Sequence, residues 1–310
     1  MNIKLAENFR AVFYAPFYAT LALGFHQEEG VDIKLIESPS PGSGIADLVQ
    51  GRLDVVWGGP LRVIRERDQV APVTGSSLVA FCEVAAKDPF YLVGRGDHAA
   101  VCAESIDGAP FDIRALAAMR LGSVSEVPTP WLCLEQDLRD RGVDPSALSR
   151  IADRTMQQNI DALNRGEIDV AQVFEPFVSI AQQQGAQVLA AASARGYTAY
   201  TTFISTYDGV SRNREAFEAM IRAVEKFGPW LREHGPVELA RVVAPFYPHV
   251  SPDILERAMT RYQLAQLWTC RRVVSRAGYA RLVQSMFQSG YISTLPRYED
   301  CIADFSAESP

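Results

Sequence analysis

Apolar and polar positions along the chain follow two spacings: short apolar runs typical of buried strands, and longer stretches with helical periodicity. One combination of the two occurs twice, at 48–60 (LVQGRLDVVWGGP) and at 163–177 (LNRGEIDVAQVFEPF). In each copy a helix is expected to end at a glycine, where a positive φ costs little. An aspartate and a short apolar strand follow, and a proline then begins the next helix.

The two copies predict an α/β fold with two lobes that face each other across a cleft. Ligands of open α/β sheets bind beyond the carboxyl ends of the strands, so the loops Gly58–Pro60 and Glu175–Pro176 should line that cleft. Chance is the alternative explanation, because glycine, an apolar residue and aspartate often form a helix-to-strand turn. The matching spacing and the matching loops favour a true repeat.

The remaining pattern completes the two lobes. Strands are expected at 3–5, 31–37, 73–83, 90–94, 120–123, 151–154, 188–192 and 197–207. Helices are expected at 45–50, 61–67, 131–141, 156–165 and 177–184, and in a helical region from 212 to 287 that should pack on the first lobe. Two chain crossings give lobe 1 as residues 1–86 and 200–310 and lobe 2 as residues 87–199, while 96–110 is expected to be a surface loop.

Composition excludes several classes of protein. The chain has 310 residues, 48% of them hydrophobic, and a net charge of −7 without a basic stripe, which argues against nucleic acid as a partner. No apolar run reaches the length of a membrane helix. Residues 1–5 read as a strand rather than a signal peptide. The protein is therefore expected to be cytoplasmic if Met1 is the native start, and periplasmic or membrane-associated if a signal peptide was removed.

Motifs for catalysis and for metal binding are missing from the sequence. The five cysteines are far apart and form no CxxC pair, and only four histidines are present, so neither a disulfide framework nor a zinc site is expected. No GxSxG, HExxH or P-loop motif occurs. We expect no catalytic residues, no metal and no cofactor.

The order of these segments resembles the type II periplasmic binding proteins of ABC importers, and more narrowly the NMT1/THI5-like family with its SsuA- and TauA-type members. The resemblance covers roughly residues 1–290 and is carried by the order of four segments: 48–55, 120–131, 168–176 and 200–203. It implies a monomeric solute-binding protein with a small-molecule ligand and an ABC-transporter permease as a partner. The family also contains cytoplasmic enzymes that make the thiamine pyrimidine. Their cysteine-rich iron motif is not matched here, because Phe81-Cys82-Glu83 has a single cysteine.

The loops expected at the cleft supply aromatic and hydrogen-bonding groups. The aromatic residues could stack a flat ligand or simply fill the core, and the glycines could present backbone N–H groups to a ligand oxygen or form a plain turn. Two hydroxyl residues could cap a helix or bind a ligand. These candidate ligand-binding residues are Phe9, Phe13, Tyr14, Trp57, Gly58, Gly59, Ser125, Thr129, Trp131, Phe174 and Tyr200.

Charged residues near the expected cleft favour one class of ligand. Glu83, Glu126 and Glu175 follow or end strands, and carboxylates suit an amine or an amino-heterocycle such as a thiamine precursor. Each could instead be a solvated loop charge. Arg10 and Arg62 are the nearby cations, and they would suit the alternative ligand class, an aliphatic sulfonate or another anion. A third possibility is a cytoplasmic enzyme of the same fold, a pyrimidine synthase or a desulfinase-like protein.

Overall fold

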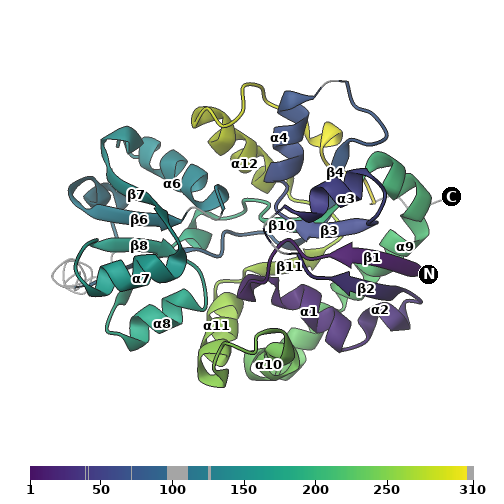
Figure 1. Ribbon diagram of the computed structural model, residues 1–310, viewed down its shortest axis with the longest axis horizontal. Helices are drawn as coiled ribbons and strands as arrows, with labels where there is room; N and C mark the ends of the chain where they lie inside the picture. The colour runs from purple at the N-terminus through teal and green to yellow at the C-terminus, as the bar shows by residue number, and fades with distance from the viewer. Residues whose placement is uncertain (39, 41, 71, 96–110, 125–126, 306–310) are drawn as a thin grey trace. The chain divides into compact units, whose positions relative to one another are not determined.

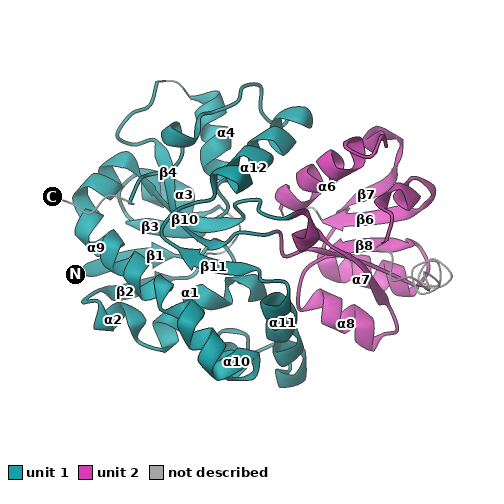
Figure 2. Ribbon diagram, turned by 180° about the vertical axis from the view of Figure 1, so that it is seen from behind, with its two compact units in different colours: residues 1–87, 196–310 teal, residues 88–195 magenta. Residues whose placement is uncertain are grey.

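The structure is a computed structural model that describes residues 1–38, 40, 42–70, 72–95, 111–124 and 127–305. The chain forms two compact units (Figure 2): unit 1 comprises residues 1–87 and 196–310, and unit 2 comprises residues 88–195. The junctions at 87/88 and 195/196 lie close to the boundaries expected from the sequence, 86/87 and 199/200. The expected surface loop at 96–110 lies outside the described residues.

Unit 1 is built on a six-stranded sheet with the order β11-β4-β10-β3-β1-β2. Its strands are β1 (Asn2–Ala6), β2 (Asp32–Ile36), β3 (Val55–Gly58), β4 (Leu78–Ala85), β10 (Thr201–Thr206) and β11 (Trp268–Arg271). Strand β1 is parallel to β2 and β3, whereas β10 runs antiparallel to β3 and β4. The carboxyl ends of β1, β3 and β4 therefore share one edge of the sheet with the start of β10.

Helices cover both faces of this sheet. Figure 1 shows α3, α4 and α12 on one side and α1, α10 and α11 on the other. The α-helices are α1 (Ala15–Ala22), α2 (Phe25–Glu28), α3 (Gly44–Val49), α4 (Leu61–Gln69), α9 (Tyr207–Glu225), α10 (Phe227–Val243), α11 (Pro252–Leu264) and α12 (Arg276–Gln288). Short 3₁₀ helices are η1 (Val12–Tyr14), η5 (Ala244–Phe246) and η6 (Tyr298–Asp300). The helical region after Arg212 thus belongs to unit 1, as the sequence predicts.

Unit 2 is built on a five-stranded sheet with the order β7-β6-β8-β5-β9. Its strands are β5 (Tyr91–Gly94), β6 (Arg120–Val124), β7 (Ser149–Arg154), β8 (Val170–Val173) and β9 (Gln187–Ala191). Its helices are η2 (Ile113–Ala118), α6 (Thr129–Arg139), η3 (Pro145–Ala147), α7 (Met156–Asn164), α8 (Phe177–Gln183) and η4 (Ala192–Arg195). Helix α6 lies on one face of the sheet and α7 and α8 lie on the other (Figure 2).

The repeat predicted from the sequence is confirmed in both units. Gly51 and Gly166 adopt φ values of 72° and 69°, the left-handed region that glycine reaches at low cost. In unit 1 the Lys4 N–H of β1 donates to Asp54 Oδ2 at 2.8 Å. In unit 2 the Arg120 N–H of β6 donates to Asp169 Oδ2 at 2.7 Å. The two aspartates therefore have the same structural role: Asp54 links β3 to β1, and Asp169 links β8 to β6.

Three boundaries differ from the expectation for local reasons. Strand β4 begins at Leu78 rather than at 73, because Ser77 N–H donates to the Thr74 carbonyl and closes a turn. Helix α6 begins at Thr129, two residues before the expected start, with a proline in its first turn. Strand β11 begins at Trp268, the residue at which a helix over 252–268 was expected to end, because its edge position beside β4 satisfies backbone groups that a helix end would leave open.

Candidate functional site

Four aromatic residues predicted to contact a ligand meet at the carboxyl edge of the unit 1 sheet. The ring centroids of Phe9 and Phe13 lie 6.0 Å apart, those of Phe9 and Tyr14 lie 5.4 Å apart, and those of Phe13 and Tyr14 lie 4.4 Å apart. Tyr200 joins the group through an edge-to-face contact of 5.7 Å with Phe13. We call Phe9, Phe13, Tyr14 and Tyr200 the aromatic cluster. Its members come from the segment after β1 and from the residue before β10.

Trp57 lies beneath this cluster and is part of the core. Its side chain is 0% exposed, and its indole stacks on Phe17 with a centroid distance of 4.6 Å. Tyr14 contacts it from the side of the cluster at 6.1 Å. Trp57 therefore belongs to the core that supports the aromatic cluster.

Gly59 lets the loop after β3 approach Tyr200 closely, whereas a side chain on Gly58, the last residue of β3, would meet only ordinary contacts. A Cβ atom on Gly59 would lie 3.2 Å from the Tyr200 carbonyl oxygen, and one on Gly58 would lie 3.7 Å from the Asn8 side chain. The loop leads directly into α4, whose N-cap residue Pro60 provides no side-chain cap. The first N–H groups of a helix lack intrahelical partners, so the start of α4 offers donors and a partial positive charge.

Asn8 organises the polar part of this edge, and the sequence analysis did not select it. The residue is buried, and its Nδ2 donates to the Tyr14 hydroxyl at 3.2 Å. Its Oδ1 accepts from the Gly42 N–H at 2.9 Å and from Arg62 Nη2 at 3.2 Å. The available signal was its position, because Asn8 is the second residue after β1 and such residues face the ligand crevice of α/β sheets.

Arg62 and Arg10 are both near this edge but differ in their partners. Arg10 donates to Glu37 at 2.7 Å and to Glu7 at 3.1 Å; burial lowers its pKa, but these bonds outweigh it and hold the pKa above the usual range. Arg62 is half-buried, and burial lowers the pKa of its guanidinium. In the part of the chain that the structure describes, no carboxylate forms an ion pair with Arg62. Since arginine stays charged in proteins, Arg62 is a cation in need of a counter-ion.

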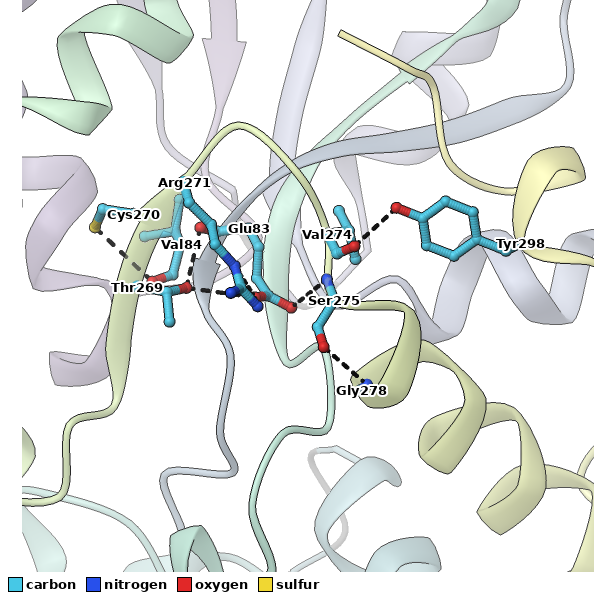
Figure 3. A network of polar contacts seen from close by, with 9 residues as sticks. All are labelled: Glu83, Val84, Thr269, Cys270, Arg271, Val274, Ser275, Gly278 and Tyr298. Atoms are coloured by element: carbon cyan, nitrogen blue, oxygen red, sulfur yellow. Dashed lines mark hydrogen bonds and ion pairs between the residues drawn. The ribbon is translucent and has the colours of Figure 1, made fainter. Parts of the chain in front are cut away.

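Glu83 makes its contacts inside unit 1 (Figure 3). The carboxylate is 0% exposed, and it accepts from Arg271 Nε at 2.9 Å and from the Ser275 N–H at 3.1 Å. Thr269 Oγ1 lies at 3.4 Å. Burial raises the pKa of Glu83, and Arg271 opposes that rise. The residue joins β4 to β11 and to the start of α12, so its oxygens are already used within the unit.

In unit 2, Glu175 is likewise occupied by its own surroundings. It is 0% exposed, and its carboxylate accepts from the Ser179 N–H and from Ser179 Oγ, both at 3.0 Å. These bonds satisfy donors in the first turn of α8. The preceding residue, Phe174, is buried in an edge-to-face contact of 5.0 Å with Phe90.

The other candidates of unit 2 lie around the start of α6. Trp131 is mostly buried, and the Arg150 guanidinium lies over its ring at 3.7 Å. Arg150 Nε also donates to Ser123 Oγ at 2.8 Å. Thr129 is the first residue of the helix, whereas Ser125 and Glu126 lie outside the described residues. Sequence reasoning missed Arg150, because nothing in the spacing of β7 indicates that its side chain reaches Trp131.

The described residues contain neither a metal-ion cluster nor a membrane-spanning helix. No group of three or more histidine, cysteine or acidic side chains is arranged to hold a metal ion there. None of the helices described combines the length and the hydrophobicity that a membrane crossing requires.

A family model for the NMT1-like family matches residues 9–244. The chain belongs to this family. Among curated proteins, a putative binding protein of Bacillus subtilis, YtlA, is 23% identical over 93% of this chain and 84% of its own length. The NMT1-like match confirms the family that the order of segments indicated.

Solved structures with the same fold include a periplasmic binding protein and a component of an import system. The periplasmic aliphatic sulphonate binding protein SsuA of Escherichia coli superposes with a TM-score of 0.73, at 13% identity, over 97% of each chain. A ligand-binding component of an ABC-type import system from Staphylococcus aureus, determined with zinc bound, gives a TM-score of 0.69 at 14% identity, over 98% of this chain and 96% of its own. The predicted fold class, a periplasmic-binding-protein α/β fold, is confirmed.

Proposed function

We propose that this NMT1-like protein is the solute-binding component of an ABC-type importer, and that it binds a small organic anion at the carboxyl edge of the unit 1 sheet. Membership in the family and the likeness to import components support the first part. Arg62 carries the second part. A half-buried guanidinium without a carboxylate partner in the described residues attracts a carboxylate, sulfonate or similar group.

The surroundings of Arg62 suit such a group. Asn8 holds the guanidinium through Oδ1, which leaves its remaining N–H groups for a ligand. The uncapped start of α4 adds donors to the same loop. Phe9 is the most exposed ring of the aromatic cluster, and it offers an apolar contact for a ring or an alkyl chain. The best-fitting ligand therefore combines one anionic group with a compact apolar body.

A thiamine-precursor or other amino-heterocycle remains a prediction from the sequence with weaker support. It depends on free carboxylates, and both Glu83 and Glu175 accept hydrogen bonds from their own units. Glu126, the third carboxylate of that argument, lies outside the described residues. The clamping of a ligand between two lobes also stays a prediction. By likeness to the named import components we propose a periplasmic location and a permease as the partner.

Calorimetry with matched ligands tests the proposed ligand class. Benzenesulfonate, benzoate and benzylamine share a ring and differ in charge, and the two anions should bind more tightly than the amine. Replacing Arg62 by Gln should weaken the anions roughly ten- to a hundredfold, since charge-assisted bonds contribute about 1.5–3 kcal/mol each. Arg65→Gln is the matched control, because Arg65 is exposed on the same helix and bonds to Tyr291. If the wild type binds benzylamine most tightly and Arg62→Gln does not change the affinity for the anions, the amino-heterocycle is favoured instead.

A further inference from the structure

Unit 2 contains a cavity of about 740 Å³ that none of the candidate ligand residues explains. Apolar side chains from three elements line it, among them Phe90, Leu92, Leu134 and Leu189. Three of these, Leu92, Leu134 and Leu189, are also members of the hydrophobic core of unit 2. Protein interiors are packed with few voids larger than a water molecule, whereas small-molecule sites have this size and are lined mainly by apolar groups.

Three charged residues stand at one wall of the cavity. Arg195 donates through Nη1 to Asp88 Oδ2 at 2.6 Å and through Nε to Asp137 Oδ2 at 2.7 Å. Asp88 is 0% exposed, Arg195 is 7% exposed and Asp137 is 16% exposed. Asp137 and Arg195 line the cavity directly. We call Asp88, Arg195 and Asp137 the acidic triad, because two carboxylates share one guanidinium.

The triad leaves one negative charge without a partner. Asp88 uses its other oxygen to accept from the Phe90 N–H at 2.9 Å. Both bonds from Arg195 to Asp137 end on Oδ2. Among the residues that the structure describes, Asp137 Oδ1 has no hydrogen-bond donor. Asp137 is 16% exposed and lines the cavity, so water can hydrate Oδ1 when the cavity is empty, and an ammonium group would replace that water with a charge-assisted bond.

The other charges that line the cavity do not balance this one. Arg114 pairs with Asp112 at 2.6 Å, and both are exposed. Arg141 is exposed and donates through Nη1 to the Asp137 backbone carbonyl at 3.0 Å rather than to the carboxylate. Exposed charges are screened by solvent and salt. The triad is more buried, so its charge is screened less.

We propose that this cavity is a second ligand site, specific for a small amphiphilic amine. The ammonium group donates to Asp137 Oδ1 and compensates the charge of the triad, while the apolar body packs between Leu134 of α6 and Leu189 of β9. The site lies within unit 2 and shares no residue with the Arg62 site. Since Arg195 and Asp88 are the last and first residues of unit 2, its occupant binds beside the two points where the chain enters and leaves that unit.

Three probes of similar size test this site on the full chain: 2-phenylethylamine, 2-phenylethanol and phenylacetate, with binding measured by calorimetry. The amine should bind most tightly and phenylacetate least. Asp137→Asn should weaken the amine at least about tenfold and leave the alcohol unchanged. Asp140→Asn is the matched control, since Asp140 is an exposed carboxylate three residues further along the chain, at the C-cap of α6. Arg62→Gln should not change amine binding, which separates this site from the proposed anion site.

A second variant tests the cavity without touching the triad. Ala190 lines the cavity and packs on the core of unit 2, so Ala190→Phe should fill the space and abolish binding of both the amine and the alcohol. If Asp137→Asn fails to fold, the order of the three wild-type affinities and the Ala190→Phe result decide the matter. The proposal is overturned if phenylacetate binds as well as the amine, if no probe binds, or if the amine binds Ala190→Phe unchanged.

Discussion

Asn8 Oδ1 accepts a hydrogen bond from Arg62 Nη2 at 3.2 Å, although the two residues are 54 positions apart in the sequence. An amide oxygen holds the guanidinium in place without neutralising it, so the charge of Arg62 remains for a ligand. This pairing of an uncharged acceptor with a half-buried cation is the feature of unit 1 that favours an anion most directly.

Converting the amide into a carboxylate should remove that advantage. In Asn8→Asp the new carboxylate pairs with Arg62 and competes with the ligand for it. We expect benzenesulfonate to bind roughly tenfold or more weakly, with the midpoint of thermal unfolding unchanged or higher. Calorimetry and a thermal melt measure the two effects. A large loss of stability with unchanged affinity would show that Asn8 acts only as a structural residue.

The buried Glu83 should make stability depend on pH. Its pKa is raised above the ordinary value of 4.5, mainly by burial. A carboxyl group with a raised pKa in the folded state contributes stability that is fully present below its unfolded pKa and is lost as pH rises through the folded pKa. The free energy of unfolding of the wild type, minus that of Glu83→Gln, should therefore decrease as pH rises from about 4.5.

Urea unfolding of both proteins at several pH values measures this difference. An increase with pH would mean that Arg271 and the Ser275 N–H hold the pKa of Glu83 below its ordinary value instead. Replacing Glu66 by Gln provides a comparison with a less buried carboxyl group. Glu66 is only half-buried, and burial raises its pKa as well. The effect of pH on that variant should have the same sign and a smaller size.

Glu175→Gln should affect folding more than binding. The substitution weakens two hydrogen bonds to Ser179 at the start of α8, and bonds to a charged group contribute about 1.5–3 kcal/mol. We expect a loss of stability of about 1–3 kcal/mol with little change in the affinity for benzylamine or benzenesulfonate. A selective loss of affinity for the amine, at unchanged stability, would instead support the amino-heterocycle ligand.

Arg195→Met should be among the most damaging single substitutions in unit 2. It leaves Asp88 and Asp137 without their shared cation, and removing one partner from a buried ion pair costs about 3–5 kcal/mol. The matched control is Arg139→Met, whose partner Glu135 lies 3.8 Å away in a more exposed pair. Chemical denaturation of both variants gives the comparison. Equal, small losses would show that the acidic triad carries no net stabilisation.

The sequence predicted those features that depend on neighbouring residues. Gly51 and Gly166 end helices in the way their repeats indicated, and the aromatic residues after β1 do cluster at the edge of the sheet. Features that depend on distant partners could not be seen. Glu83 looked like an open carboxylate because Arg271 lies 188 positions away.

The same limit explains what was missed in the candidate site. Arg62 was recognised as a nearby cation, but that no carboxylate of the described residues pairs with it follows only from the positions of the surrounding side chains. Asn8 became important only through Gly42 and Arg62, which approach it from two other segments. Arg10, by contrast, has one acidic partner close to it in the sequence, Glu7, and a second, Glu37, that lies 27 positions away. Charge at a cleft is therefore a weaker predictor of ligand class than the pairing of that charge.

The aspartates of the repeat have one further consequence, which concerns strand register. Parallel neighbours have no hairpin between them to set their stagger, and a shift by one residue would turn every side chain to the opposite face. Asp54 and Asp169 each accept from one backbone N–H of the adjacent strand and donate their own N–H to the carbonyl of that same residue, at 3.0 Å to Lys4 and 2.9 Å to Arg120. The aspartate of each copy thus fixes the register of its strand against the parallel neighbour. The residues that follow each aspartate therefore reach the edge of the sheet in a defined position.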